Sequence, residues 1–170
     1  MEQARQSIVL IGMPGAGKST LGILLAKTLG LAFGDTDLSI QVQQSKTLQQ
    51  ISDDEGYLAL RHYEEQVLLS ETLTDRVIAT GGSAVYSEPG MLRLKEQALV
   101  VFLDVCLEEL EKRVNDFATR GIARRPDQSF AELFTERRAL YNRYADIVIE
   151  CSDLSIEESL HAVIKAIESR

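Results

Sequence analysis

The chain has 170 residues, of which 45% are hydrophobic and 26% charged. This length and composition are typical of one compact domain with a buried core, expected to span residues 1–170, and exclude a disordered chain. The formal net charge of −8 argues against a duplex nucleic-acid partner, because such partners require a basic surface. The sequence has no run of about 18 apolar residues, and residues 1–6 are mostly polar. We therefore expect no membrane span, no signal peptide and a cytoplasmic location.

Apolar strand patterns alternate with helical patterns along the chain, which predicts an α/β fold with a parallel sheet and helices on both faces. The expected strands are Ser7–Ile11, Leu31–Gly34, Val77–Ala79, Leu99–Leu103 and Asp146–Glu150. The expected helices are Lys18–Leu29, Leu38–Gln44, Leu48–Ile51, Tyr57–Leu73, Met91–Gln97, Leu107–Phe117, Phe130–Tyr144 and Ile156–Ile167. Ligands of such sheets bind beyond the carboxyl ends of the strands, so the residues that follow each strand are the candidates for function.

A glycine-rich stretch, GMPGAGKST at residues 12–20, follows the first expected strand and leads into the first expected helix. It matches G-x-x-x-x-G-K-[ST] in the strand-to-helix context of a phosphate-binding loop. Glycines allow successive N–H groups to point at a phosphate, the Lys18 ammonium reaches the β- and γ-phosphates, and the Ser19 hydroxyl ligates Mg²⁺. The alternative is a glycine-rich turn that binds no ligand. The residues predicted to bind a nucleoside triphosphate are Gly15, Ala16, Gly17, Lys18, Ser19 and Thr20.

Two carboxylates, Asp35 and Asp37, follow the second expected strand and point the same way if the segment is extended. One can hold Mg²⁺ through water while the other accepts the proton of a substrate hydroxyl. The alternative is that Asp37 only caps the following helix.

The third expected strand leads into Gly81-Gly82, two residues without side chains. They either let the backbone approach a ligand closely or form a tight turn, and the segment supplies no carboxylate for a metal. The metal role is therefore assigned to Ser19 and Asp35.

Several arginines are candidates for holding anions in this acidic chain. Arg61 and Glu64 lie three residues apart on one helix face, where Glu64 either orients Arg61 toward a carboxylate or phosphate or forms an exposed ion pair with it. The polar loop at about 116–128 is either a lid over the phosphates or a solvated surface loop. Its basic residues are Arg120, Arg124 and Arg125.

Two further basic positions flank that loop. Arg113 precedes it and could reach the nucleotide. Arg137 and Arg138 follow it on a helix, where they either hold an anionic substrate or form a solvated face. We consequently expect any anionic ligand to be captured by locally placed arginines and lysines rather than by the overall charge of the chain.

Taken together, these stretches resemble the shikimate kinase family, in the same order and over nearly the whole chain. The phosphate-binding loop alone is shared by many nucleotide-binding proteins, whereas the combination is specific. The matching stretches are GMPGAGKST at residues 12–20, Asp35-Thr36-Asp37 for D-[ST]-D, GYLALRHYE at 56–64 for G-E-x-x-F-R-x-x-E, VIATGGSAV at 77–85 for the glycine-triplet segment, Arg125-Pro126 for the lid, and RRALY at 137–141 for R-x-P-L-Y.

The resemblance implies the five-stranded parallel sheet of the nucleoside monophosphate kinase type, with strand order 2-3-1-4-5. It implies acceptor-binding helices at about 37–73 and a lid at about 116–128. It also implies a kinase that uses ATP and Mg²⁺ to phosphorylate a hydroxyl of a small carboxylate-bearing metabolite, in the first place shikimate to shikimate 3-phosphate. We expect such a kinase to act as a monomer without a nucleic-acid or membrane partner.

The family roles map onto this sequence one residue at a time. The resemblance implies that Ser19 ligates Mg²⁺ with Asp35 assisting through water, and that Asp37 binds the reacting hydroxyl and acts as its base. The implied catalytic residues are Lys18, Asp37 and Arg125. Those implied to bind the acid substrate are Asp37, Arg61, Gly81, Gly82 and Arg137. Arg113 and Arg125 are expected to join the phosphate-binding loop in holding ATP.

The chain departs from the family pattern near the acceptor. Ser83 replaces the third glycine of the triplet, Tyr57 and Leu60 replace a glutamate and a phenylalanine, Asp127-Gln128 replaces two leucines, and Ala139 replaces a proline. Two alternatives therefore stay open at this point. One is a related kinase for another hydroxy or sugar acid such as gluconate, and the other is a nucleotide-binding module without catalytic activity.

Overall fold

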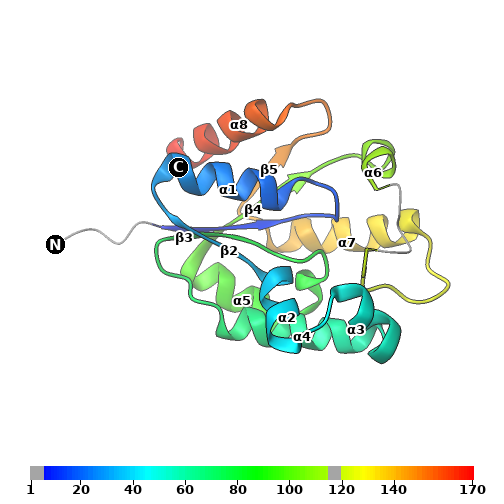
Figure 1. Ribbon diagram of the computed structural model, residues 1–170. Helices are drawn as coiled ribbons and strands as arrows, with labels where there is room; N and C mark the ends of the chain where they lie inside the picture. Colours follow the sequence, from blue (N-terminus) through cyan, green and yellow to red (C-terminus); the bar gives the residue numbers. More distant parts are fainter. Residues whose placement is uncertain (1–5, 115–119) are drawn as a thin grey trace.

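The computed structural model describes residues 6–114 and 120–170, which fold around one parallel sheet (Figure 1). The strands are β1 (Ser7–Ile11), β2 (Ala32–Asp35), β3 (Arg76–Ala79), β4 (Ala98–Asp104) and β5 (Ile147–Glu150). Their order in the sheet is β2-β3-β1-β4-β5, and each neighbouring pair is parallel. The α/β class expected from the sequence pattern and the strand order implied by the family resemblance are confirmed.

The two central strands β1 and β4 are buried along their whole length. Both are continuous apolar runs, as expected for strands that helices cover on both faces. The edge strands β2 and β5 are shorter and more exposed, and Val148 in β5 is 47% exposed. The core of the molecule therefore lies on both sides of β1 and β4.

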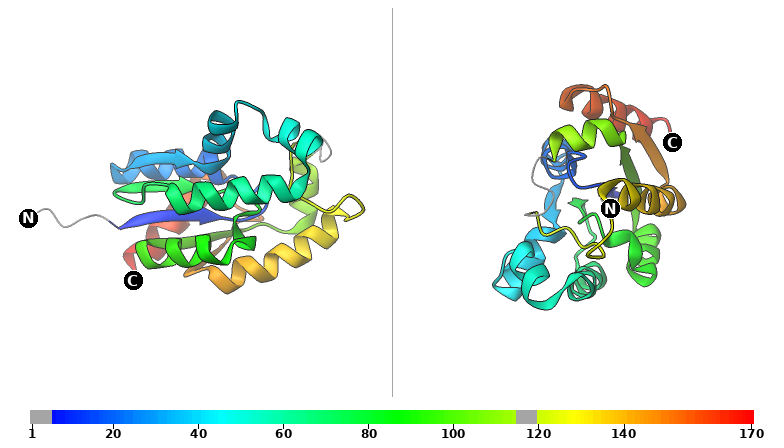
Figure 2. Two further views of the ribbon diagram at one scale, coloured as in Figure 1. Left: turned by 90° about the horizontal axis from the view of Figure 1, so that it is seen from below. Right: turned by 90° about the vertical axis from the view of Figure 1, so that its right-hand side faces the viewer.

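Helices cover both faces of the sheet, with α1 and α8 on one face and α4, α5 and α7 on the other (Figures 1 and 2). The helices α2 and α3 pack beside α4, and α6 lies near the carboxyl edge of the sheet. Their bounds are α1 (Lys18–Leu29), α2 (Thr36–Gln44), α3 (Leu48–Glu55), α4 (Tyr57–Ser70), α5 (Glu88–Gln97), α6 (Leu107–Arg113), α7 (Phe130–Tyr144) and α8 (Ile156–Glu168), with a 3₁₀ turn η1 (Ala84–Tyr86).

Several helix ends differ from the sequence-based prediction for local reasons. Helix α4 ends at Ser70 rather than Leu73, and the Ser70 hydroxyl donates to the Gln66 carbonyl at 2.8 Å in its last turn. Helix α5 begins earlier than predicted because Ser87 caps it by accepting the Gly90 N–H at 3.0 Å. The predicted helix Leu107–Phe117 is helical to Arg113, and its expected end lies outside the described residues.

The path of the chain places the candidate residues at one edge of the sheet. From β1 the chain forms β2 and β3 on one side and then β4 and β5 on the other, so the direction of strand order reverses at β1. Ligands of open α/β sheets bind outside the carboxyl ends of the strands at such a point. The right-hand view of Figure 2 faces this edge, and residues 120–129 cross it between α3 and α7. In the described part of the chain, no helix has both the length and the apolar character needed to span a membrane.

Candidate functional site

The glycine-rich stretch after β1 forms a phosphate-binding loop that ends at the first residue of α1. Gly15 and Gly17 have φ angles of 85° and 92°, a backbone region that favours glycine. A Cβ on Gly15 would come within 2.7 Å of the Val114 side chain, so α6 packs directly against the loop. Because Gly17 is the N-cap of α1 and offers no side chain, the free N–H groups of the first turn remain available to an anion.

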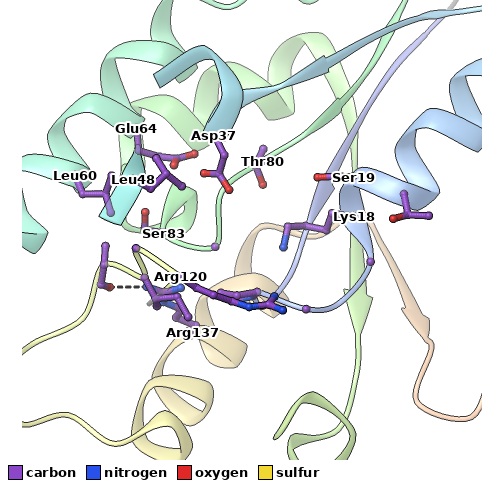
Figure 3. Close-up of a pocket in the computed structure, with 18 residues that line it drawn as sticks. Lys18, Ser19, Asp37, Leu48, Leu60, Glu64, Thr80, Ser83, Arg120 and Arg137 are labelled. Atoms are coloured by element: carbon purple, nitrogen blue, oxygen red, sulfur yellow. Dashed lines mark hydrogen bonds between the residues drawn. The ribbon is translucent and has the colours of Figure 1, made fainter. Parts of the chain in front are cut away.

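Lys18 is held inside this loop by the loop's own carbonyls. Its ammonium donates to the carbonyl oxygens of Gly12 at 2.7 Å and Met13 at 2.8 Å. The side chain is only 8% exposed, and burial lowers the pKa of Lys18 to about 8, against the opposing effect of Asp37. The loop thus fixes a cationic donor at the wall of the cavity described below (Figure 3).

Ser19 and Asp35 form an oxygen pair next to the loop. The Ser19 hydroxyl donates to Asp35 Oδ2 at 2.6 Å, while Asp35 Oδ1 accepts the backbone N–H groups of Asp37 at 3.0 Å and Leu38 at 3.3 Å. Asp35, not Asp37, is therefore the N-cap of α2, which leaves Asp37 free of the capping role considered for it. The pair fits the oxygen preference of Mg²⁺. Among residues 6–114 and 120–170 there is no group of three His, Cys, Asp or Glu side chains that could bind a metal alone.

Asp37 and Glu64 place two carboxyl groups at one wall of the cavity. Burial, followed by the charge of Asp35, raises the pKa of Asp37 to about 6. Burial, followed by the charge of Asp37, raises the pKa of Glu64 to about 8. A Cβ on Gly81 would collide with both carboxyl groups, so only glycine lets the backbone after β3 approach them.

Glu64 does not orient Arg61, contrary to the prediction from their spacing. The Thr36 hydroxyl donates to Glu64 Oε1 at 3.0 Å, and the Gly81 N–H donates to the same oxygen at 3.2 Å. These partners come from β2–α2 and from the end of β3, which converge on the buried face of α4. The Arg61 guanidinium instead lies 3.6 Å from the ring centre of Tyr86.

Arg61 consequently does not line the main cavity. It borders a separate hollow of about 320 Å³ that is shared with Tyr86. The Nε and Nη2 atoms of Arg61 are buried and have no hydrogen-bond partner among the described residues. The position of Arg61 does not test the prediction that this residue binds an acid. Its guanidinium still has unpaired N–H donors that can bind an anion.

Arg137 lines the main cavity from the opposite wall to Asp37 (Figure 3). It is 1% exposed, and its Nη2 donates to the Ala123 carbonyl at 2.6 Å. A Cβ on Gly82 would come within 2.6 Å of Arg137 Nη1, so the glycine admits the guanidinium. The neighbouring Arg138 instead pairs with Asp104 at 2.7 Å and takes no part in the cavity wall. The structure thus separates two adjacent arginines into one cavity residue and one structural residue.

The loop before α7 brings Arg120 to the cavity instead of Arg125. Residues 120–123 line the cavity, and the Gly121 N–H is fixed by Gln49 Oε1 of α3 at 2.7 Å. Arg125 lies outside the lining and pairs with Glu136 at 3.2 Å, with half of its side chain exposed. The expected lid at 116–128 is therefore described only from residue 120, since 116–119 lie outside the described residues. The Arg-Pro motif predicted Arg125 as the lid residue. The glycine that follows Arg120 is the sequence feature that indicates a turn at the cavity.

The cavity itself has a volume of about 480 Å³ and joins these groups in one space (Figure 3). Ser83, which the sequence marked as a departure from the family pattern near the acceptor, is part of its wall, 7% exposed and with no capping hydrogen bond from its side chain. Sequence reasoning missed Leu48, Thr80 and Ile122, because nothing in their local pattern marks them as wall residues. The lining residues are Pro14, Gly15, Gly17, Lys18, Ser19, Thr20, Asp37, Leu48, Leu60, Glu64, Thr80, Gly82, Ser83, Arg120, Gly121, Ile122, Ala123 and Arg137.

Another cavity, of about 270 Å³, opens on the other side of the phosphate-binding loop. Its wall includes Ala16 and Gly17 of the loop, Arg113 of α6 and Ile156 of α8. Arg113 also donates to the Gly15 carbonyl at 3.4 Å. The loop is therefore flanked by a polar cavity on the side of Asp37 and a more apolar one on the side of Arg113.

Comparisons with known proteins agree with this geometry. A family model described as "Shikimate kinase" matches residues 14–168. A shikimate kinase of Microcystis aeruginosa is 42% identical over 151 residues, which cover 87% of this chain and 78% of the relative, and one of Paracidovorax citrulli is 38% identical over 154 residues, covering 88% and 84%. The crystallised shikimate kinase of Acinetobacter baumannii in complex with shikimate is 30% identical, with a TM-score of 0.87 over 96% of this chain and 93% of that one.

Proposed function

Since the chain belongs to the shikimate kinase family, we propose that it transfers the γ-phosphoryl group of ATP to a hydroxyl of shikimate, giving shikimate 3-phosphate and ADP. One observation carries the proposal. A single cavity unites a phosphate-binding loop, a carboxylate at Asp37 and a buried guanidinium at Arg137, which are groups for a phosphate, a hydroxyl and a carboxylate.

The nucleotide site is proposed around the loop. The phosphates lie against the N–H groups of residues 15–20 at the start of α1, with Lys18 as a fixed cation. The cavity beside Arg113 has the position and apolar character to take the base of ATP. Ser19 and Asp35 are the residues that hold Mg²⁺, which neutralises charge on the phosphates when bound.

The acceptor site is proposed on the side of Asp37. Its carboxylate accepts a hydrogen bond from the reacting hydroxyl and takes the proton as the new P–O bond forms and the bond to the ADP oxygen breaks. Its pKa of about 6 keeps it ionised at neutral pH and basic enough for that role. Arg137 binds the carboxylate of the acid, and Gly82, which lines the cavity, offers its backbone to the substrate. Gly81 lies outside the cavity lining and contributes by letting Asp37 and Glu64 approach the backbone.

Arg120 takes the role over the phosphates that the sequence assigned to Arg125. It lines the cavity from the loop that crosses the carboxyl edge of the sheet, whereas Arg125 is committed to Glu136. A guanidinium in that place stabilises charge on the group in transfer, and the surrounding loop limits access of water.

The test is an assay of ADP formation by the purified chain with ATP, Mg²⁺ and shikimate. We expect shikimate to stimulate ADP formation, and Asp37→Asn to lower kcat by about 10²–10⁴-fold because the general base is lost. Asp127→Asn, a change of an exposed loop acid, is the matched control and is expected to retain activity. Strong turnover with gluconate or another hydroxy acid, and none with shikimate, would transfer the assignment to that acid. Basal ADP formation that no acid stimulates would leave only a nucleotide-binding module.

A further inference from the structure

The least satisfied charged groups in the described part of the chain surround one tyrosine. Of the five buried side-chain polar atoms without a partner among residues 6–114 and 120–170, two belong to Arg61 (Nε and Nη2) and one to Arg137 (Nε). Buried donors are rarely left unpaired, so these N–H groups indicate a missing acceptor. Both arginines face the ring of Tyr86, with guanidinium-to-ring-centre distances of 3.6 Å for Arg61 and 5.5 Å for Arg137.

Arg61 is held in this place by aromatic rings rather than by a carboxylate. Glu64, three residues on, is occupied by Thr36 and Gly81, and Glu65, which borders the same hollow as Arg61, accepts the Ser87 hydroxyl at 2.6 Å. The rings of Tyr86 and Tyr57, at 3.6 Å and 5.1 Å from the guanidinium, lie close enough for cation–π attraction. That attraction offsets part of the repulsion between two like charges, while Arg61 Nε, Arg61 Nη2 and Arg137 Nε keep their N–H groups unpaired among the described residues.

Tyr86 is itself fixed from a third element. It ends the 3₁₀ turn η1 that follows Gly81-Gly82, and its hydroxyl donates to Glu136 Oε1 of α7 at 2.5 Å. The other oxygen of Glu136 accepts Arg125 at 3.2 Å and Gln128 at 3.1 Å. Burial and the bond to Glu136 raise the pKa of Tyr86, so the phenol stays protonated and remains a donor. The ring therefore has a defined orientation under both arginines.

We propose that Tyr86 is a positioning residue for the acid substrate, whose ring keeps the guanidinium groups of Arg61 and Arg137 beside each other with free N–H donors for one carboxylate. This inference rests on the proposed kinase function and names a residue that the family pattern does not mark. Tyr86 does not touch the reacting atoms and acts through the two arginines. Loss of the ring should therefore weaken acid binding while nucleotide binding is preserved.

The experiment compares Tyr86→Leu and Tyr86→Phe in steady-state kinetics with ATP and shikimate. We expect Tyr86→Leu to raise the KM for shikimate about ten-fold, with the KM for ATP changed less than about two-fold. Tyr86→Phe keeps the ring and is expected to restore most of the acid affinity. Tyr86→Gln, which has a polar side chain without a ring, serves as a second variant and should behave as Tyr86→Leu. Calorimetric titration of shikimate into the MgADP complex checks the same effect without turnover.

The matched control is Tyr63→Leu, because Tyr63 lies on the same helix as Arg61 but donates its hydroxyl hydrogen bond to Glu55 at 2.6 Å and contacts the tilted ring of His62. It should leave the KM for shikimate unchanged. An unchanged KM for shikimate in both ring-less variants would overturn the inference, as would equal weakening of ATP and shikimate. Failure of the proposed function shows differently, as a wild-type chain that does not phosphorylate shikimate at all.

Discussion

At the scale of single residues, the site depends on carboxyl groups that are costly to bury. Burial raises the pKa of both groups, and a neighbouring charge adds to this effect, that of Asp35 at Asp37 and that of Asp37 at Glu64. Glu64 is 2% exposed and has hydrogen bonds from Thr36 and Gly81 that hold the end of β3 against α4. The backbone around the acceptor cavity is thus held in place by hydrogen bonds to Glu64, a carboxyl group whose raised pKa favours its protonated form.

This arrangement predicts how stability changes with pH. The folded-state pKa of Glu64, about 8, lies above its ordinary value of 4.5, so the folded chain binds a proton that the unfolded chain releases. The stability that this group contributes is therefore fully present below pH 4.5, falls as pH rises from 4.5 to about 8, and is lost above that. Glu64→Gln keeps the carbonyl acceptor and removes the charge, so we expect it to raise the melting temperature of the ligand-free protein at pH 9 by about 2–6 °C and less at pH 6.

Differential scanning calorimetry at pH 6 and pH 9 measures this difference. Glu96→Gln, which changes an exposed acid on α5, is the control. It should shift the melting temperature only slightly, and by the same amount at pH 6 and at pH 9. A Glu64→Gln effect that is the same at pH 6 and pH 9 would contradict a buried carboxyl with a raised pKa.

At the scale of elements, the loop at residues 120–129 decides which arginine lines the cavity. Its first residues line the cavity, anchored by Gly121 to Gln49 of α3 and by Ala123 to Arg137 of α7. Its later part turns outward, where Arg125 pairs with Glu136. Arg120 and Arg125 are therefore only five positions apart in the sequence, but Arg120 lines the cavity and Arg125 lies outside it.

We predict that Arg120→Ala lowers kcat by about 10²–10³-fold, because a charge-stabilising donor at the transferring group is lost. Arg125→Ala is the matched variant in the same loop and is expected to change kcat less than about three-fold, since an exposed ion pair contributes little. Stopped-assay kinetics at saturating ATP and shikimate provide the comparison. The opposite ranking, with Arg125→Ala the inactive variant, would return the role to the residue that the Arg-Pro motif indicated.

Much of the fold was predictable from the sequence because its signals are local. Continuous apolar runs marked β1 and β4, and the glycines on either side of α1 fixed its ends. The short turn η1 was missed because three residues carry no periodicity. The ends of α4 and α5 were displaced because single serines, Ser70 and Ser87, settle them through hydrogen bonds.

The site was less predictable where partners are distant in sequence. The spacing of Arg61 and Glu64 predicted a contact, but Thr36 and Gly81, 28 and 17 residues from Glu64, take its oxygen instead. The aromatic environment of Arg61 depends on Tyr86 from another element and could not be read from the helix alone. By contrast, Lys18 and Asp37 lie just beyond the carboxyl ends of β1 and β2, so their convergence on one edge follows from the parallel topology.

At the scale of the whole molecule, an acidic chain presents an anion-binding cavity. The net charge is −8, yet Lys18, Arg120 and Arg137 line one space at the carboxyl edge of the sheet. Local placement of cations, rather than the overall field, is what suits the site to phosphates and an acid. The monomeric state, the cytoplasmic location and the absence of a nucleic-acid partner stay predictions.

The most direct test of the central claim is identification of the product by ³¹P nuclear magnetic resonance after incubation of the chain with ATP, Mg²⁺ and shikimate. The account predicts that ADP and one new phosphomonoester signal, coupled to a proton of the shikimate ring, appear together and in equal amounts. Omission of shikimate should abolish the new signal. Formation of ADP and inorganic phosphate without any shikimate phosphate would contradict the account.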